Sequence, residues 1–282
     1  MAEILLNVIS ISAILAIPTQ SIILGLKAGR PFFKELFSQK KLLSRFIITM
    51  FVIIPGVAIM FSYITGNLIS IWSVVLIIAV APASPGVVKV MSKLEGDQNV
   101  STAWMILTML LSLIFFPIII MMLQAYLGIV LKLGVVDVVI KLMILFIVPL
   151  GIGFLIAKYS QEKTDKIKKI LEPVSKIAML TLIVSLLISS VPLIIKNGIT
   201  PIILLLSFII VSLVIAHVMG SPEREFGPIL PFSIVHRLPA PAVILTKLNG
   251  TMEMHLPVII SYTILATIVM IIYNKIFFGK KN

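Results

Sequence analysis

The chain has 282 residues, of which 60% are hydrophobic and 12% are charged, and its mean hydropathy is +1.19. Soluble domains are about 45–50% apolar and about 25% charged, so these values predict a polytopic membrane protein and exclude a large soluble domain. The formal net charge of +12 indicates basic cytoplasmic loops rather than a nucleic-acid partner, and the lack of cysteine excludes disulfides and thiolate metal sites.

About nine apolar segments are long enough to cross a lipid bilayer, which takes about 20 residues. They run over residues 3–26, 43–65, 68–94, 98–126, 134–158, 173–195, 199–219, 223–249 and 252–277. The sequence therefore predicts an all-α membrane protein that forms one transmembrane domain over residues 1–282.

Basic residues gather in the loops 27–45 and 158–176 and in the C-terminal tail. An odd number of spans places these groups on one side, which the positive-inside rule assigns to the cytoplasm. We therefore expect a plasma-membrane protein with its N-terminus outside and its C-terminus inside. Residues 160–172 are expected to form a short surface helix that joins the two halves.

A short internal similarity predicts two copies of one unit. Residues 92–97 align with residues 246–251, and the same alignment places Pro85 on Pro239. The first four spans then correspond to the last four, with one copy in about 1–133 and the other in about 134–282. A shift by an odd number of spans gives the copies opposite orientations, an inverted repeat of the kind found in many secondary transporters.

Prolines interrupt the third and the eighth segments, at Pro82 and Pro85 and again at Pro239 and Pro241. Proline lacks a backbone donor and clashes with the preceding turn, so each segment is expected to be a broken helix. Such a break survives in a membrane only when it is buried in protein or lines a wet cavity, where its free backbone groups can bind ions or substrate. The sequence therefore predicts two broken, crossing helices that carry the substrate site.

Ionisable side chains at membrane depth indicate function, because their desolvation is costly. Arg237 keeps its charge and offers a planar fork suited to a carboxylate. His236 could shuttle protons or serve as a hydrogen-bonded structural residue. Lys89 could line the cavity or extend toward the cytoplasmic face, and Gln20 and Ser21 could face the cavity or bond a neighbouring helix.

Hydroxyl side chains on the helix after the first break share one face, and they could line the site or join neighbouring helices. Together with the residues at the breaks they form the predicted substrate site, for which no metal and no cofactor is expected. The candidates are Ser84, Pro85, Gly86, Lys89, Ser101, Thr108, Ser112, Ser233, His236, Arg237 and Pro239.

The run from Pro82 to Gly86, followed by Gly96 and Asp97 and then by a hydroxyl-bearing helix, resembles the bile acid:sodium symporter superfamily. Residues 236–242 are similar to the second break of that family. The resemblance implies a secondary transporter with two broken crossing helices. Auxin-efflux-carrier-type proteins have a similar broken-helix plan and are an alternative.

The resemblance also implies sodium ligands, and this chain departs from them. The family's Ser-Asn pair after the first break falls on Val87 and Val88, and its Glu and Gln at the second break fall on Ser233 and Arg237. Valine side chains cannot bind sodium and an arginine would repel it, so sodium coupling through these positions is not expected. Arg237 would instead supply a fixed positive charge.

We therefore predict a secondary transporter that moves a small organic anion across the bilayer by alternating access. The solute would be exchanged, moved down its gradient, or coupled to protons, with sodium as the alternative ion. A non-transporting receptor on the same fold is a competing possibility. A membrane-embedded enzyme is disfavoured, because the three histidines are dispersed and few acidic residues lie within the spans.

Overall fold

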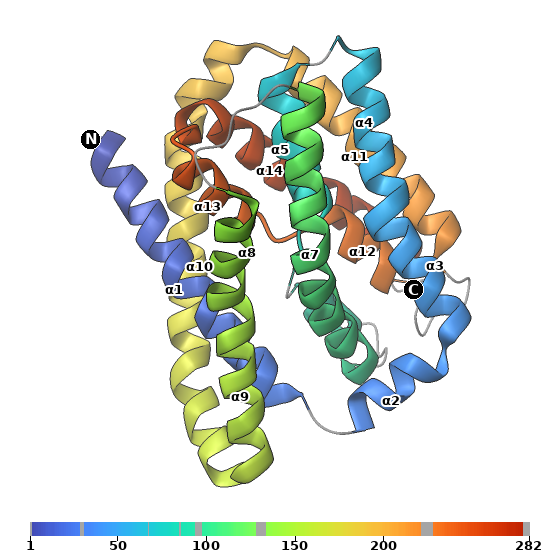
Figure 1. Ribbon diagram of the computed structural model, residues 1–282, viewed down its shortest axis with the longest axis vertical. Helices are drawn as coiled ribbons and strands as arrows, with labels where there is room; N and C mark the ends of the chain where they lie inside the picture. The colour runs from blue at the N-terminus through green and yellow to red at the C-terminus, as the bar shows by residue number, and fades with distance from the viewer. Residues whose placement is uncertain are drawn as a thin grey trace.

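The computed structural model is a bundle of α-helices (Figure 1), described over residues 2–28, 31–66, 68–84, 86–93, 98–127, 134–220 and 228–278. Over these ranges the only β-structure is one isolated bridge, between Ala83 and Arg237. The elements are α1 (Ala2–Lys27), α2 (Pro31–Ser38), α3 (Lys40–Ile48), η1 (Thr49–Ile53), α4 (Ile54–Ile64), α5 (Ile69–Ala79), α6 (Gly86–Lys93), α7 (Gln98–Leu127), α8 (Val135–Leu142), η2 (Met143–Ile147), α9 (Val148–Tyr159), α10 (Gln161–Asn197), α11 (Thr200–Met219), α12 (Ile229–Val235), α13 (Ala240–Leu248) and α14 (Met252–Phe278).

Within the described ranges, 6 helices are long and apolar enough to cross a membrane: Asn7–Lys27, Lys40–Ile64, Asn99–Ala125, Val136–Tyr159, Thr200–Met219 and Met252–Phe278. Each coincides with a predicted span to within a few residues, which confirms an all-α polytopic membrane protein. The other predicted spans are the two broken segments and residues 173–195. Their crossing of the membrane, and the inverted repeat, stay predictions.

Helix α10 differs from the prediction at its start. The surface helix expected over residues 160–172 is not a separate element, because α10 runs without interruption from Gln161 to Asn197. Its first turn is capped by Ser160, whose side chain accepts a hydrogen bond from the Lys163 N–H at 3.3 Å. The charged residues that suggested a separate surface helix therefore extend a longer helix.

Helix α1 packs against α9 and α10 (Figure 1). Where α1 meets α9, the backbones of the two helices are in direct contact. A Cβ atom on Gly25 would lie 2.2 Å from the Leu150 carbonyl oxygen, and one on Gly153 would lie 2.2 Å from the Ile22 carbonyl oxygen. Glycine permits this approach because it has no side chain to separate the helices. Helices α1, α9 and α10 thus form one closely packed group, which we call the α1 group.

Two π-helical turns occur in equivalent surroundings, each just before a proline. Segment η1 precedes Pro55, and η2 precedes Pro149. Proline removes one donor from the helix ladder, and its ring clashes with the carbonyl four residues earlier. A π turn widens the ladder at such a point, and it leaves backbone carbonyls available to other partners.

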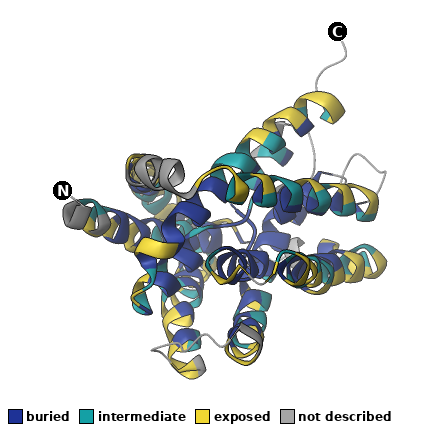
Figure 2. Ribbon diagram, turned by 90° about the horizontal axis from the view of Figure 1, so that it is seen from above, coloured by how far each residue is buried: buried dark blue, intermediate teal, exposed yellow. Residues whose placement is uncertain are grey.

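Buried residues gather at the centre of the bundle (Figure 2), and many large apolar side chains are exposed on its outside. Exposed aliphatic side chains include Ile114 at 59%, Ile144 at 61% and Val218 at 72%. Continuous apolar surface of this kind is unfavourable in water, so it indicates contact with lipid. Helix α2, which lies within the basic segment 27–45, and the turn between α9 and α10 lie at the same end of the bundle (Figure 1). The shared end agrees with the part of the charge pattern that concerns these two segments, and the orientation of the chain in the membrane stays a prediction.

Candidate functional site

The two broken segments meet near the centre of the molecule. Helix α5 ends at Ala79 and α6 begins at Gly86, while α12 ends at Val235 and α13 begins at Ala240. Residues 80–84 and 236–239, which we call the crossing, lie between these helix ends. Pro82 and Pro239 lie within the crossing, and both lack the N–H that would continue a helix.

The two halves of the crossing run antiparallel and hydrogen-bond to each other through their backbones. The Ser84 N–H donates to the His236 carbonyl at 3.1 Å, and the Leu238 N–H donates to the Pro82 carbonyl at 3.0 Å. These bonds enclose the bridge between Ala83 and Arg237. Each break therefore satisfies part of the backbone of the other, as unwound chain in a membrane requires.

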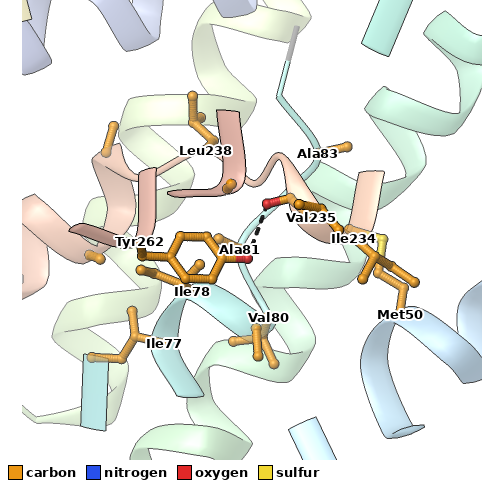
Figure 3. Close-up of a cluster of buried hydrophobic side chains, with 14 of the residues drawn as sticks. Met50, Ile77, Ile78, Val80, Ala81, Ala83, Ile234, Val235, Leu238 and Tyr262 are labelled. Atoms are coloured by element: carbon orange, nitrogen blue, oxygen red, sulfur yellow. Dashed lines mark hydrogen bonds between the residues drawn. The ribbon is translucent and has the colours of Figure 1, made fainter. Parts of the chain in front are cut away.

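Apolar side chains surround the crossing (Figure 3). Ile78 and Val80 come from the first broken segment, and Ile234 comes from the second. The hydroxyl of the buried Tyr262, on α14, donates to the Val235 carbonyl at 3.1 Å, and Figure 3 marks this bond. The C-terminal end of α12 therefore has a donor from a neighbouring helix.

The Arg237 side chain lies inside this apolar shell, with 3% of its surface exposed. Its Nε donates to the Ile234 carbonyl at 3.1 Å, and its Nη1 donates to the Ala81 carbonyl at 2.8 Å. Its Nη2 donates to the Met50 carbonyl at 3.0 Å. One guanidinium thus links three separate helical segments through backbone oxygens. Its role toward a substrate carboxylate stays a prediction.

The Met50 carbonyl is available to Arg237 because of the π turn beside it. The Ile54 N–H donates to the Thr49 carbonyl, in the π pattern. The next residue is Pro55, which has no N–H to offer to the Met50 oxygen. The proline therefore frees the carbonyl that the guanidinium binds.

The predicted hydroxyl groups of α7 lie next to the crossing and are buried. The Thr108 hydroxyl accepts a hydrogen bond from the Ala83 N–H at 3.2 Å. The Ser112 hydroxyl donates to the Thr108 carbonyl at 2.7 Å, and Ser101 is fully buried. On the second broken segment, Ser233 accepts a hydrogen bond from the Trp104 indole N–H at 2.9 Å. The bond of Thr108 connects α7 to the crossing and the bond of Ser233 connects α12 to α7, whereas the bond of Ser112 lies within α7.

Four of the predicted residues line a cavity of about 80 Å³, and they are Ser84, His236, Arg237 and Pro239. The His236 Nε2 lies 3.4 Å from the Thr267 hydroxyl, and its Nδ1 has no hydrogen-bond partner among the described residues. The Gly86 N–H donates to the Ser84 hydroxyl at 3.3 Å. Pro85 and the side chain of Lys89 lie outside the described part of the structure.

A larger cavity, of about 550 Å³, lies between the α1 group and the crossing. Its apolar walls include Met105, Met109 and Phe146, and Ala83 and Leu238 reach it from the crossing. Its polar lining residues are Gln20, Ser21, Lys27, Thr102, Glu172, Ser175 and Lys176. None of the described predicted site residues is among the residues that line this cavity.

Two of these lining residues had a signal in the sequence. Gln20 and Ser21 interrupt an apolar span, and the buried Ser21 hydroxyl has no hydrogen-bond partner among the described residues. Glu172 lies at the end of the predicted linker 160–172, and Lys176 lies in the predicted span 173–195; both are on the continuous helix α10 and line the cavity. Lys27 and Glu172 form an ion pair of 3.8 Å, with side chains 45% and 54% exposed.

The comparisons with known proteins agree with this geometry. No curated protein matches the chain. The model of the Sodium Bile acid symporter family matches residues 14–197, which is more than half of the 282 residues. This match includes the second half of α1, the first broken segment, α7 and all of α10. The chain therefore belongs to the sodium bile acid symporter family, whose members are transporters.

Proposed function

We propose that this protein is a secondary transporter that moves a small amphipathic organic anion by alternating access. The observation that supports this most directly is the cavity of about 550 Å³ beside the crossing. Ligand pockets commonly have volumes of about 300–1,000 Å³, with mostly apolar walls and a few polar groups that fix orientation. This cavity has that character.

The charge of the cavity lining favours an anion. Lys27 and Lys176 line it together with one carboxylate, that of Glu172. Because Lys27 and Glu172 pair at 3.8 Å on half-exposed side chains, the pair is weak and a substrate carboxylate can compete for the lysine. The apolar walls would then hold the body of the substrate while the lysines hold its acidic group.

The position of the cavity supports a rigid-body mechanism. One wall belongs to the α1 group, whose helices are held together by the glycine contacts of Gly25 and Gly153. The opposite wall belongs to the crossing and to α7, which Thr108 ties to the first break. Movement of one body against the other would open the cavity alternately to each side. The predicted inverted repeat would supply the symmetry for such a motion.

Uptake by proteoliposomes tests the proposal. Radiolabelled acetate, octanoate and cholate differ in the size of the apolar body attached to one carboxylate. We expect accumulated, chemically unchanged solute for octanoate or cholate and little for acetate. Binding without flux would indicate a receptor, and conversion would indicate an enzyme. An imposed pH gradient tests whether protons drive uptake, for which His236 is the candidate group.

Two cavity variants and one control make the test specific. Met109→Trp should reduce uptake strongly, because it fills the cavity that Met109 lines. Lys176→Gln should raise the KM for an anion about 5- to 10-fold, the effect of losing about 1 kcal/mol of charge interaction. Lys166→Gln is the matched control on the same helix, since Lys166 pairs with Glu162 on the exposed surface. Equal uptake in all three variants would contradict the assignment of the cavity.

A further inference from the structure

The crossing gathers negative partial charge from several helix ends. Helices α5 and α12 both terminate there, and the C-terminal end of a helix carries about half a negative charge on its free carbonyls. The Ile234 oxygen belongs to the last turn of α12, the Ala81 oxygen lies just beyond the end of α5, and the Met50 oxygen is added from the π turn. In broken-helix transporters, carbonyls of this kind coordinate the coupling cation.

In this chain the cation is already present as a side chain. The three oxygens accept hydrogen bonds of 2.8 to 3.1 Å from the Arg237 guanidinium. The side chain is buried among apolar residues and its guanidinium stays charged in proteins. The positive charge that balances the negative helix ends is thus supplied by a side chain of the protein itself.

The same residues do not fit a sodium ion. Hard cations bind oxygen ligands, and the carbonyls that could provide them already bind the guanidinium. Of the nearby side chains, Val87 is buried and Val88 lines the larger cavity, and neither carries an oxygen. A second cation beside the fixed guanidinium would also meet like-charge repulsion.

We propose that the Arg237 guanidinium is the permanent cation of the crossing, in place of a dissociable sodium ion, so that transport requires no sodium. This inference rests on the proposed transport function. A tethered cation cannot cross the membrane with the solute, so it holds the two breaks together without contributing an ion gradient. Transport energy then comes from the solute gradient or from another ion.

The first experiment needs no variant. The wild-type protein is melted, and assayed for octanoate uptake, in sodium chloride and in choline chloride at equal ionic strength. We expect the same apparent Tm and the same initial rate in both salts. The proposal would be overturned if the initial rate rose about threefold with increasing sodium concentration. A rise of several degrees in the apparent Tm with sodium would overturn it too.

The second experiment removes the cation and returns it from solution. In Arg237→Ala the apparent Tm should fall by about 5 °C or more, and low-millimolar guanidinium should restore at least about half of the loss. Choline at the same ionic strength should restore none. Uptake should be lost in the variant and regained with guanidinium, which gives the variant a cation requirement that the wild type does not have.

Arg45→Ala is the matched control, because Arg45 is exposed on α3 and should show neither the loss nor the rescue. If Arg237→Ala does not fold, Arg237→Lys replaces it. A single ammonium group cannot replace all three guanidinium contacts, so the apparent Tm should lie below that of the wild type and remain independent of sodium. Full stability of Arg237→Ala, or no response to guanidinium, would refute the inference. Because Tm is measured without any solute, these outcomes are separate from a failure of the transport assay.

Discussion

Removing the Thr108 hydroxyl should destabilise the crossing, because this hydroxyl accepts the hydrogen bond of the Ala83 N–H at 3.2 Å. Both residues are buried, so in Thr108→Val the amide of the unwound chain would have neither a helix partner nor water. An unsatisfied buried donor costs about 1–3 kcal/mol, whereas the volume of the side chain hardly changes. The apparent Tm should therefore fall by roughly 2–8 °C.

The assay is thermal unfolding in detergent, followed through the fluorescence of the two buried tryptophans and compared at one scan rate. Thr108→Ser keeps the hydroxyl and should retain most of the stability. Ser112→Ala removes a hydroxyl that donates to the Thr108 carbonyl within its own helix, and it should cost less than about 0.5 kcal/mol. If Thr108→Val and Ser112→Ala have the same apparent Tm, the proposed support of the crossing by α7 is wrong.

The remaining predictions concern other contacts of the same scaffold. Trp104→Phe loses the 2.9 Å bond to Ser233 but keeps an aromatic ring, so we expect a loss of about 1 kcal/mol in thermal unfolding. Gly153→Leu places a side chain where a Cβ would lie 2.2 Å from a carbonyl of α1, which should cost about 3 kcal/mol or more and reduce the folded yield. Gly151→Leu is its control, since no atom lies within 4 Å of its Cβ position. Tyr262→Phe removes the donor to the C-terminal end of α12, and it should cost roughly 1 kcal/mol in the same assay.

Each of these predictions has an outcome that contradicts it. Equal yields of Gly153→Leu and Gly151→Leu would show that α1 and α9 do not depend on backbone contact. An unchanged melting curve in Trp104→Phe or in Tyr262→Phe would show that the corresponding hydrogen bond adds nothing to stability. In that case apolar burial alone would hold the broken helix in place.

Much of the fold could be predicted because its signals are local. Hydropathy located the long helices to within a few residues, since a bilayer imposes a minimum apolar length. Prolines located both breaks, because a missing N–H acts on its own helix. The one wrong boundary, at residues 160–172, arose where charged residues extend a helix that the sequence pattern divides in two.

The candidate site was predicted less completely, and its cavity shows why. Lys27 and Lys176 come from different helices, and nothing in either segment indicates that they line one space. Thr108 and Ser233 could be picked out from the sequence because they are polar residues in apolar helices. Their partners are a backbone amide and an indole on other helices, which no local pattern reveals.

The sequence by itself therefore determined the membrane class, six of the helical spans, the two breaks, and the buried arginine that marks one of them. Only the tertiary structure decided what that arginine does. Two of the three carbonyls that bind Arg237 lie 156 and 187 residues away in the chain, and backbone carbonyls are the same in every residue. The choice of partner depends on where helices end and where a proline frees an oxygen, so it exists only once the helices have come together.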